Sequence, residues 1–252
     1  MTTALVPLRD GVSGKSRLAA VLDAGSRRRL VRVLARHVVS TLLAADGIER
    51  VVVVTADPVF TRETLAGLAV EVLEQPADRP GLNGALEHAR EVLAADGTAG
   101  GTAADGTAGG SAADGTAAGA AGSRLLVAHA DLPALTRQDV TALLAETAPV
   151  VIATDRYRSG TNLLLVPFEG GVSSLSAVAK ARNPALEGEG GFRFRFGVGS
   201  LAAHLDEAAA HGLAATVVDR PGTAVDLDTA DDWSQLPDEV RAAVRHEVPE
   251  LL

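Results

Sequence analysis

Two aspartates of the sequence stand where proteins often hold a hard divalent cation. Asp131 follows an apolar run that is typical of a buried strand, and Asp226 follows another such run at short range. Ligands of open α/β sheets bind outside the carboxyl ends of the strands, and Mg²⁺ prefers oxygen ligands. A turn or a helix N-cap is the commoner role of such an aspartate. Thr229 with Asp232 fits a capping box, so Asp228 is interpreted as structural and Asp226 as the better metal candidate.

A lysine-containing loop near the N-terminus could hold phosphate. Gly14-Lys15-Ser16 resembles the end of a P-loop, but Arg9 stands where that motif requires glycine, so the motif fails. The loop still follows an apolar run and precedes a predicted helix. Its backbone amides could cradle phosphates, with Lys15 and Arg17 adding positive charge; an ordinary surface loop would look the same, and both interpretations stay open. With the two aspartates, a phosphate loop would make a Mg²⁺-dependent phosphoryl or nucleotidyl transfer site.

Three further turns rich in Gly, Ser and Thr are candidates for ligand contacts. Thr161 closes the turn Ser159-Gly160-Thr161, and Gly197 precedes a helix that Ser200 opens. Amides and the dipole at that helix start could face an anion, although simple capping by Ser200 explains the same residues. Asn83 also stands at a helix start, where it either reads a base or merely begins the helix.

Strands and helices alternate along the chain, which predicts a doubly wound α/β sheet with helices on both sides. Residues 51–55 are β-branched throughout, as in a parallel strand buried on both faces. Apolar residues between 28 and 45 recur with the period of an amphipathic helix. The predicted strands are 4–8, 51–55, 70–73, 124–129, 149–154, 161–167, 192–196 and 214–218. The predicted helices are 28–45, 60–65, 82–93, 137–146 and 200–211, with helical segments near 230–247.

One tract interrupts this alternation. The tetrapeptide Ala-Asp-Gly-Thr recurs at 95–98, 104–107 and 113–116, a period of nine residues. A calcium-binding β-roll has nonapeptide repeats but needs a bulky apolar residue in each, and none is present. Residues 95–122 are therefore predicted to be a low-complexity, disordered insertion. Because the alternation resumes after it, residues 1–252 are interpreted as a single domain.

Composition excludes several classes of protein. The chain has 252 residues, 47% of them hydrophobic, so it can build a core. Its net charge of −9 argues against nucleic-acid and anionic-membrane partners. The absence of cysteine excludes disulfides, thiolate metal sites and a cysteine nucleophile. No apolar run is long enough to span a membrane, and no secretory signal is seen at the N-terminus. A cytoplasmic protein is the default expectation.

Taken together, the motifs resemble a known family. Lys15-Ser16-Arg17-Leu18, Gly81-Leu82-Asn83, Ala130-Asp131-Leu132-Pro133, Gly160-Thr161-Asn162, Phe196-Gly197-x-x-Ser200 with His204, and Asp226-Leu227-Asp228-Thr229 occur in the order of the 2-phospho-L-lactate / phosphoenolpyruvate guanylyltransferases. The resemblance covers nearly the whole chain except 95–122. It implies a three-layer αβα fold with a mostly parallel, doubly wound sheet of the nucleotide-diphospho-sugar-transferase type. Members make the guanylylated three-carbon unit that starts the side chain of coenzyme F-420.

The resemblance also implies roles for individual residues. Lys15 and Arg17 would hold the triphosphate of GTP as catalytic groups, and Asn83 would lie near the guanine or ribose. Asp131 and Asp226 would bind Mg²⁺. The positions that receive the phosphate and carboxylate of the acceptor match Thr161, Gly197 and Ser200. Three stretches depart from the pattern of the family: 9–12 lacks the usual lysine, 157–159 is less glycine-rich than usual, and 169–191 is longer.

The expected reaction condenses GTP with phosphoenolpyruvate to give enolpyruvoyl-diphospho-guanosine and pyrophosphate. Phosphoenolpyruvate, 2-phospho-L-lactate and 3-phosphoglycerate share a phosphate and a carboxylate, so the sequence does not separate them as acceptors. Two more functions stay open, those of a molybdenum-cofactor-type nucleotidyltransferase and of a non-catalytic nucleotide-binding domain. A downstream transferase of the same pathway is a further expected partner.

Overall fold

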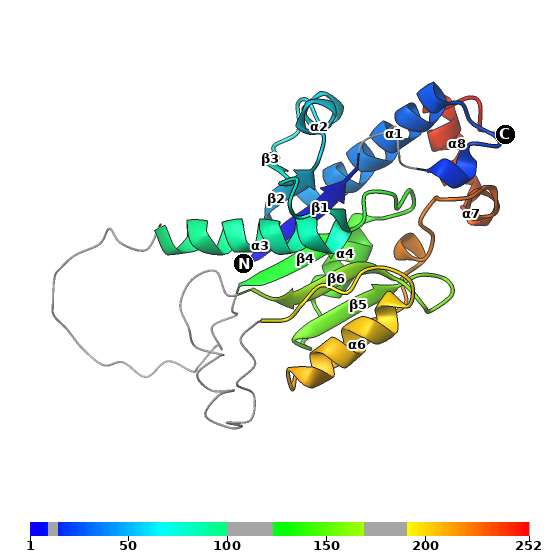
Figure 1. Ribbon diagram of the computed structural model, residues 1–252. Coiled ribbons are helices and arrows are strands. Elements are labelled where there is room, and N and C mark those ends of the chain that lie inside the picture. The colour runs from blue at the N-terminus through cyan, green and yellow to red at the C-terminus, as the bar shows by residue number, and fades with distance from the viewer. Residues whose placement is uncertain (10–14, 100–122, 169–190, 252) are drawn as a thin grey trace, which may run out of the picture.

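The computed structural model describes residues 1–9, 15–99, 123–168 and 191–251, and a seven-stranded sheet forms its middle layer (Figure 1). All but one of the predicted strands are confirmed, with shifted bounds. The strands are β1 (Thr2–Leu8), β2 (Ile48–Thr55), β3 (Glu71–Glu74), β4 (Arg124–Ala128), β5 (Val150–Thr154), β6 (Thr161–Pro167) and β7 (Ala215–Val218).

The order of the strands creates a crevice beside β1. The order is β3-β2-β1-β4-β6-β5-β7, so the chain leaves β1 in one direction and returns on its other side with β4. Ligands of open α/β sheets bind at such a switch point, outside the carboxyl ends of the strands. Strand β6 alone runs antiparallel to its neighbours β4 and β5. Its first residue, Thr161, therefore lies at the same edge of the sheet as the carboxyl end of β4.

Helices cover both faces of the sheet and complete the predicted three layers. On one face α3 (Gly81–Ala99) and α6 (Ser200–Ala210) pack on a core that includes Leu5 of β1 (Figure 1). On the other face α1 (Ala24–Leu43), α2 (Pro58–Thr64) and α4 (Arg137–Leu144) pack on a core that includes Ala4 and Val6. The β-branched run of β2 is buried throughout, as expected for a strand with helices on both sides.

A third cluster of apolar residues packs against the N-terminal part of α1. Helices α7 (Ala230–Gln235) and α8 (Asp238–Glu247) pack there against Leu30, Leu34 and Leu18. Leu18 belongs to η1 (Ser16–Leu18), a 3₁₀ helix that follows the lysine loop, and η2 (Pro221–Thr223) precedes the Asp226 loop. Both candidate loops are thus held by short helices anchored in a core.

The predicted strand 192–196 is wrong. Phe192, Phe194 and Phe196 are buried and the two arginines between them are not, which gives the alternation of a strand. The segment nevertheless joins no sheet. Its amides bond to side chains of α3 and α6 instead: those of Arg193, Phe194, Arg195 and Phe196 donate to Glu207, Glu87, His204 and Asn83 in turn.

Some predicted features fall partly or wholly outside the described residues. Helix α3 continues through the first Ala-Asp-Gly-Thr copy to Ala99, while the rest of the repeat tract lies beyond the described part of the chain. The same holds for Gly14 of the lysine loop and for 169–190. Within the described ranges, no helix has the length and apolar character needed to cross a membrane.

Candidate active site

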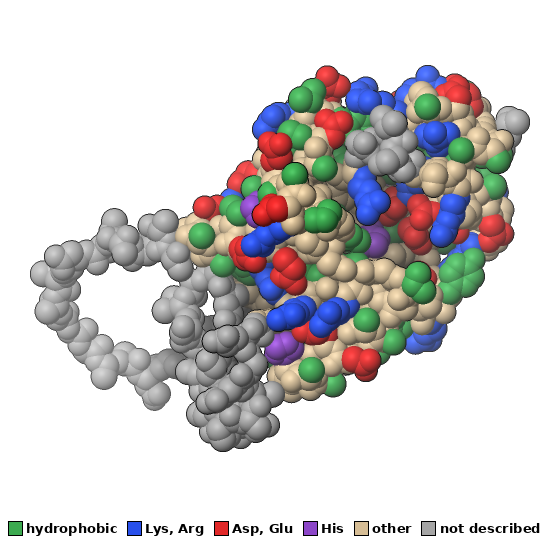
Figure 2. All heavy atoms as spheres, viewed as in Figure 1, with side chains coloured by type: hydrophobic (Ala, Val, Ile, Leu, Met, Phe, Trp, Pro, Cys, Tyr) green, Lys and Arg blue, Asp and Glu red, His purple; other side chains and the backbone are tan. Residues whose placement is uncertain are grey.

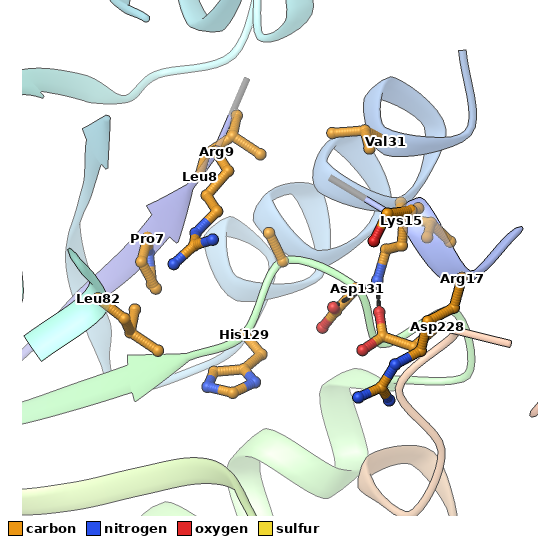
Figure 3. Close-up of a pocket in the computed structure, with 13 residues that line it drawn as sticks. Pro7, Leu8, Arg9, Lys15, Arg17, Val31, Leu82, His129, Asp131 and Asp228 are labelled. Carbon is orange, nitrogen blue, oxygen red and sulfur yellow. Dashed lines mark hydrogen bonds and ion pairs between the residues drawn. The ribbon is translucent and has the colours of Figure 1, made fainter. Parts of the chain in front are cut away.

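Lys15 lies between two carboxylates at the carboxyl edge of the sheet. Its Nζ is 2.6 Å from Asp131 Oδ2 and 2.5 Å from Asp228 Oδ1, as Figure 3 shows. The Lys15 side chain is only 7% exposed. Its backbone is in the left-handed region (φ 57°), which residues other than glycine seldom adopt. The loop therefore holds Lys15 in an uncommon conformation that points the ammonium into the sheet crevice.

The ion pairs keep Lys15 and Asp131 charged. Burial alone would lower the pKa of Lys15, but Asp131 and Asp228 raise it above its ordinary value. Burial would likewise raise the pKa of Asp131, yet the Lys15 ammonium holds it below its ordinary value. A buried cation with anionic partners is typical of a residue whose positive charge serves binding or catalysis.

A pocket of about 380 Å³ opens at this ion pair, at the switch point between β1 and β4. Three basic side chains line it, those of Arg9, Lys15 and Arg17 (Figure 3). A second pocket, of about 390 Å³, adjoins it across the end of β1. The second pocket is lined by Gln75, Pro76, Ala77 and Gly81 among others, and the two pockets share Pro7, Leu8, Arg9 and Leu82.

The Asp226 loop is joined to the Asp131 loop. Leu227 N donates to Asp131 O over 3.0 Å. Burial, and then the charge of Asp131, raise the pKa of Asp226, which is the behaviour of a buried carboxylate that lies near another. The expected neighbourhood of Asp131 and Asp226 is therefore present, while their role as metal ligands stays a prediction.

Asp228 does more than support a helix. The predicted capping box is confirmed, because Thr229 Oγ1 accepts from Asp232 N and Asp232 Oδ2 accepts from Thr229 N. Asp228 N also donates to Asp232 Oδ2, but its carboxylate faces the pocket and pairs with Lys15 (Figure 3). The cap beside it was the sequence signal, and it favoured a structural role alone.

The donor set fits a magnesium ion. Asp131 Oδ1 is buried and makes no hydrogen bond to any described residue, and the Lys15 ammonium shows that the carboxylates can surround a cation. No group of three or more His, Cys, Asp or Glu suited to a metal occurs in the described ranges. Mg²⁺ is commonly held by only one or two carboxylates together with substrate phosphates, so this site matches that pattern.

Thr161 and Ser200 meet at the same edge, beside the start of α6. Thr161 N donates to Ser200 Oγ over 2.9 Å, and Thr161 Oγ1 lies 2.9 Å from Nδ1 of His204. All three side chains are buried. Gly197 and Gly199 precede the helix with φ of 140° and 73°, so the turn depends on glycine there. The structure thus brings the three predicted acceptor residues together.

Asn83 lies next to this turn, with both ends of its amide engaged. Its Nδ2 donates to Phe196 O, and its Oδ1 accepts from Phe196 N, each over 2.9 Å. The side chain therefore fixes the residue that precedes Gly197. A contact to guanine or ribose stays a prediction, and the observed bonds give Asn83 a second role on the acceptor side.

Aromatic rings connect the two halves of the site. The ring of His129 is 5.2 Å from that of Phe196, which is 4.7 Å from that of His204. His129 lines the Lys15 pocket, and His204 contacts Thr161. Sequence reasoning gave Arg9 no role in the site and noted His204 only within the family motif. The position of Arg9 directly after β1 was the available signal for it.

Known guanylyltransferases resemble this chain in sequence. The family described as "Guanylyl transferase CofC like" matches residues 2–98. The phosphoenolpyruvate guanylyltransferase of Rubrobacter xylanophilus is 35% identical over 92% of each chain. The 2-phospho-L-lactate guanylyltransferase of Methanothermobacter thermautotrophicus is 27% identical, over 93% of this chain and 83% of that one. The 3-phospho-D-glycerate guanylyltransferase of Phenylobacterium zucineum is 32% identical, over 92% and 88%.

Solved structures share the fold at low sequence identity. A protein from Desulfovibrio desulfuricans G20, assigned as a nucleotide-diphospho-sugar transferase, superposes with a TM-score of 0.64 at 14% identity and covers 99% of this chain and 96% of its own. The 4-diphosphocytidyl-2C-methyl-D-erythritol synthase of Anaerococcus prevotii gives 0.51 at 10% identity, with 97% and 96% covered. The predicted fold class is confirmed.

Proposed function

The chain belongs to the CofC-like guanylyltransferase family and is a nucleotidyltransferase, and we propose that it transfers the guanylyl group of GTP to phosphoenolpyruvate. The observation that carries the proposal is the convergence of Lys15, Asp131 and Asp228 on a pocket at the switch point of this sheet. A lysine held in place at that edge of the sheet suits the binding of a triphosphate. Phosphoenolpyruvate is chosen because several relatives over most of the chain, including one at 35% identity, carry that name.

The reaction needs positioning and charge neutralisation more than proton transfer. An oxygen of the acceptor phosphate attacks the α-phosphorus of GTP. The new P–O bond forms as the bond to the β-phosphate oxygen breaks, and pyrophosphate leaves. Because the acceptor phosphate is already anionic near neutral pH, no general base is required. Holding the two anions in line is the main task of the protein.

Basic side chains of the first pocket would hold the triphosphate. Arg9, Lys15 and Arg17 all line it, and their charges would offset the repulsion between two anionic substrates. The adjoining pocket beyond Arg9 is large enough for the nucleoside and offers the Gln75 amide beside apolar surface. GTP would then lie across the end of β1, with its α-phosphate towards Asp131.

Asp131 and Asp226 would hold magnesium, with Asp228 as the next oxygen donor. Magnesium, when bound, neutralises charge that develops on the phosphates. Hydrogen bonds fix these carboxylates in place. Leu227 N joins the two loops through Asp131 O, and the Thr229–Asp232 cap fixes the backbone of Asp228. The carboxylates that pair with Lys15 also keep it charged and directed into the pocket.

The acceptor would bind at the turn before α6. Thr161 and Ser200 offer hydroxyl groups and Gly197 offers a backbone without a side chain, all at the edge where Asp131 lies. We propose further that the product enters the synthesis of coenzyme F-420, in keeping with the family. Relatives named for all three acids match this chain, so the three acids are compared directly in the test below.

The experiment that tests the function identifies the products by mass spectrometry. The enzyme is incubated with GTP, Mg²⁺ and, in separate reactions, phosphoenolpyruvate, 2-phospho-L-lactate or 3-phospho-D-glycerate. We expect pyrophosphate and enolpyruvoyl-diphospho-guanosine with the first acid, formed about a hundredfold more slowly by an Asp131→Asn control. If only one of the other two acids gave a product, that acid would take the place of phosphoenolpyruvate as the acceptor. No product with any of the three would overturn the proposed function.

A further inference from the structure

A buried histidine stands behind the acceptor turn and contacts neither pocket. His204 is fully buried on α6, with the ring of Phe196 edge-on at 4.7 Å and that of Phe192 stacked at 6.1 Å. Each ring nitrogen has one partner. Nε2 is 3.0 Å from Arg195 N, and Nδ1 is 2.9 Å from Thr161 Oγ1.

The partners of His204 determine where its proton lies. A backbone amide only donates, so the Arg195 amide makes Nε2 the acceptor. A neutral imidazole that accepts at one nitrogen carries its hydrogen on the other. Nδ1–H therefore donates to Thr161 Oγ1. Burial, with the nearby His129, lowers the pKa of His204 to about 4, so the ring stays neutral at physiological pH.

This chain of bonds determines what the Thr161 hydroxyl can offer. Because its oxygen accepts from His204, its hydrogen is left to donate, and no acceptor for it occurs among the described residues. Ser200 Oγ is in the same state, since it accepts from Thr161 N. Two neighbouring hydroxyls thus both present hydrogen atoms, which suits an anion and disfavours a ligand that donates.

We propose that His204 is a positioning residue that turns the Thr161 hydroxyl into a hydrogen-bond donor for the anionic acceptor. The proposal rests on the proposed function, and it adds a residue that does not itself touch the substrate. The Arg195 amide is the fixed end of the relay, because its segment is held to α6 by Glu207 as well: Arg193 N and Arg195 Nε both bond to that carboxylate.

Two conservative variants separate the two bonds of His204. In His204→Asn, the side-chain amide can take the place of Nδ1 and donate to Thr161. In His204→Gln, the amide reaches the place of Nε2 and serves Arg195 only. We expect the KM for phosphoenolpyruvate to rise about tenfold or more in the Gln variant and much less in the Asn variant. GTP affinity, measured by calorimetry, should stay within about twofold in both.

A double-mutant cycle tests whether His204 acts through Thr161. His204→Phe and Thr161→Val should each raise the acceptor KM about tenfold or more, and the double variant should raise it no further than the larger single effect. His211→Asn, at the C-cap of the same helix and bonded to Glu207, is the matched control and should leave the acceptor KM unchanged. Thermal unfolding and GTP binding report whether each variant folds.

Several outcomes would overturn the proposal. One is an equal KM effect of His204→Asn and His204→Gln, and another is multiplicative effects in the cycle. A loss of GTP affinity that parallels the loss of acceptor use would show that His204 is merely structural. If wild-type protein turns over none of the three acids, the proposed function fails instead, and the two failures are thereby distinct.

Discussion

Each carboxylate near Lys15 has a different surrounding, and this leads to different expected effects of substitution. Asp131→Asn removes the partner common to Lys15 and the predicted metal, so we expect kcat to fall by roughly a hundredfold or more, about 3 kcal/mol of transition-state stabilisation. Asp226→Asn should do the same if Asp226 is a ligand. Asp228→Asn reports on the Lys15 pair alone if Asp226 is the ligand, and the loss should then be smaller.

The measurement is kcat at saturating substrates over a range of Mg²⁺ concentrations. A ligand variant shifts the Mg²⁺ dependence to higher concentration, whereas a variant that affects only Lys15 lowers kcat at every concentration. Near-wild-type turnover in Asp226→Asn, with a large loss in Asp228→Asn, would exchange the roles of the two residues.

Thr161 gives a second prediction at the residue scale. Thr161→Val keeps the shape and removes the hydroxyl, so acceptor use should weaken by about 1–3 kcal/mol through the loss of one hydrogen bond to a charged group. Ser200→Ala should weaken it less if the helix-start amide also contacts the acceptor. The readout is kcat/KM for each acid at saturating GTP. A variant that weakens GTP binding and spares the acceptor would show that the two halves of the site are assigned the wrong way round.

Single residues also show which parts of the site can be predicted from the sequence. The places of Asp131 and Thr161 were predictable because each stands close to the end of an apolar run, and Lys15 was predictable from the loop that follows the first run. Asp228 was not, because its backbone forms part of a genuine helix cap and the direction of its side chain depends on a lysine 213 positions away. Pairings across such distances leave no local pattern.

At the scale of elements, segment 192–196 is the informative case. Its alternation of buried and exposed residues predicts a strand, and the buried phenylalanines do face the core. The pattern reports only which side chains are buried. It does not report whether the amides are satisfied by a neighbouring strand or, as here, by Asn83, Glu87, His204 and Glu207.

Asn83 allows the attachment of segment 192–196 to the helices to be tested. Asn83→Ala removes both bonds to Phe196, so the turn at Gly197 should loosen, and the acceptor KM should rise severalfold. Stability should fall by about 1–3 kcal/mol, because two buried backbone groups lose partners. Calorimetry with GTP separates this from the expected guanine contact: a loss confined to GTP affinity would favour base reading over the clamp.

For the molecule as a whole, the buried His204 predicts how stability depends on pH. Its pKa is about 4 in the folded chain against 6.5 for the free side chain, so the unfolded state binds more protons between these values. The contribution of neutral His204 to the free energy of unfolding should therefore be fully present above about pH 6.5. It should decline as the pH falls towards 4, by up to about 3 kcal/mol. His129, Glu207 and Arg195 are the charged or titratable groups that act on this ring.

Urea unfolding at a series of pH values measures this decline. His204→Phe should be less stable at neutral pH but should show a flatter profile between pH 4 and 6.5. An equally steep profile in the variant would place the titration elsewhere, with His37 the next candidate because burial lowers its pKa as well.

Topology at the largest scale explains why these distant residues meet. The three-layer fold was predictable from alternation, but the antiparallel direction of β6 was not, and it is this direction that places Thr161 at the carboxyl edge of β4. On the face shown in Figure 2, basic and acidic side chains are interspersed. On this face the basic side chains of the site do not continue into a wider basic patch among the described residues.

The clamp on Lys15 has a consequence for the order in which ligands bind. A metal that binds Asp131 must compete with an ammonium already held there, and a displaced Lys15 would lose one of its two counter-ions while it stays buried, which is costly. The triphosphate of GTP would give that ammonium a new partner. Mg²⁺ and GTP should therefore assist one another's binding, by the same factor in each direction. Calorimetric titration should show weak Mg²⁺ binding to the free enzyme and much tighter binding with GTP present, while equal affinities would show that Lys15 does not act as a resident competitor.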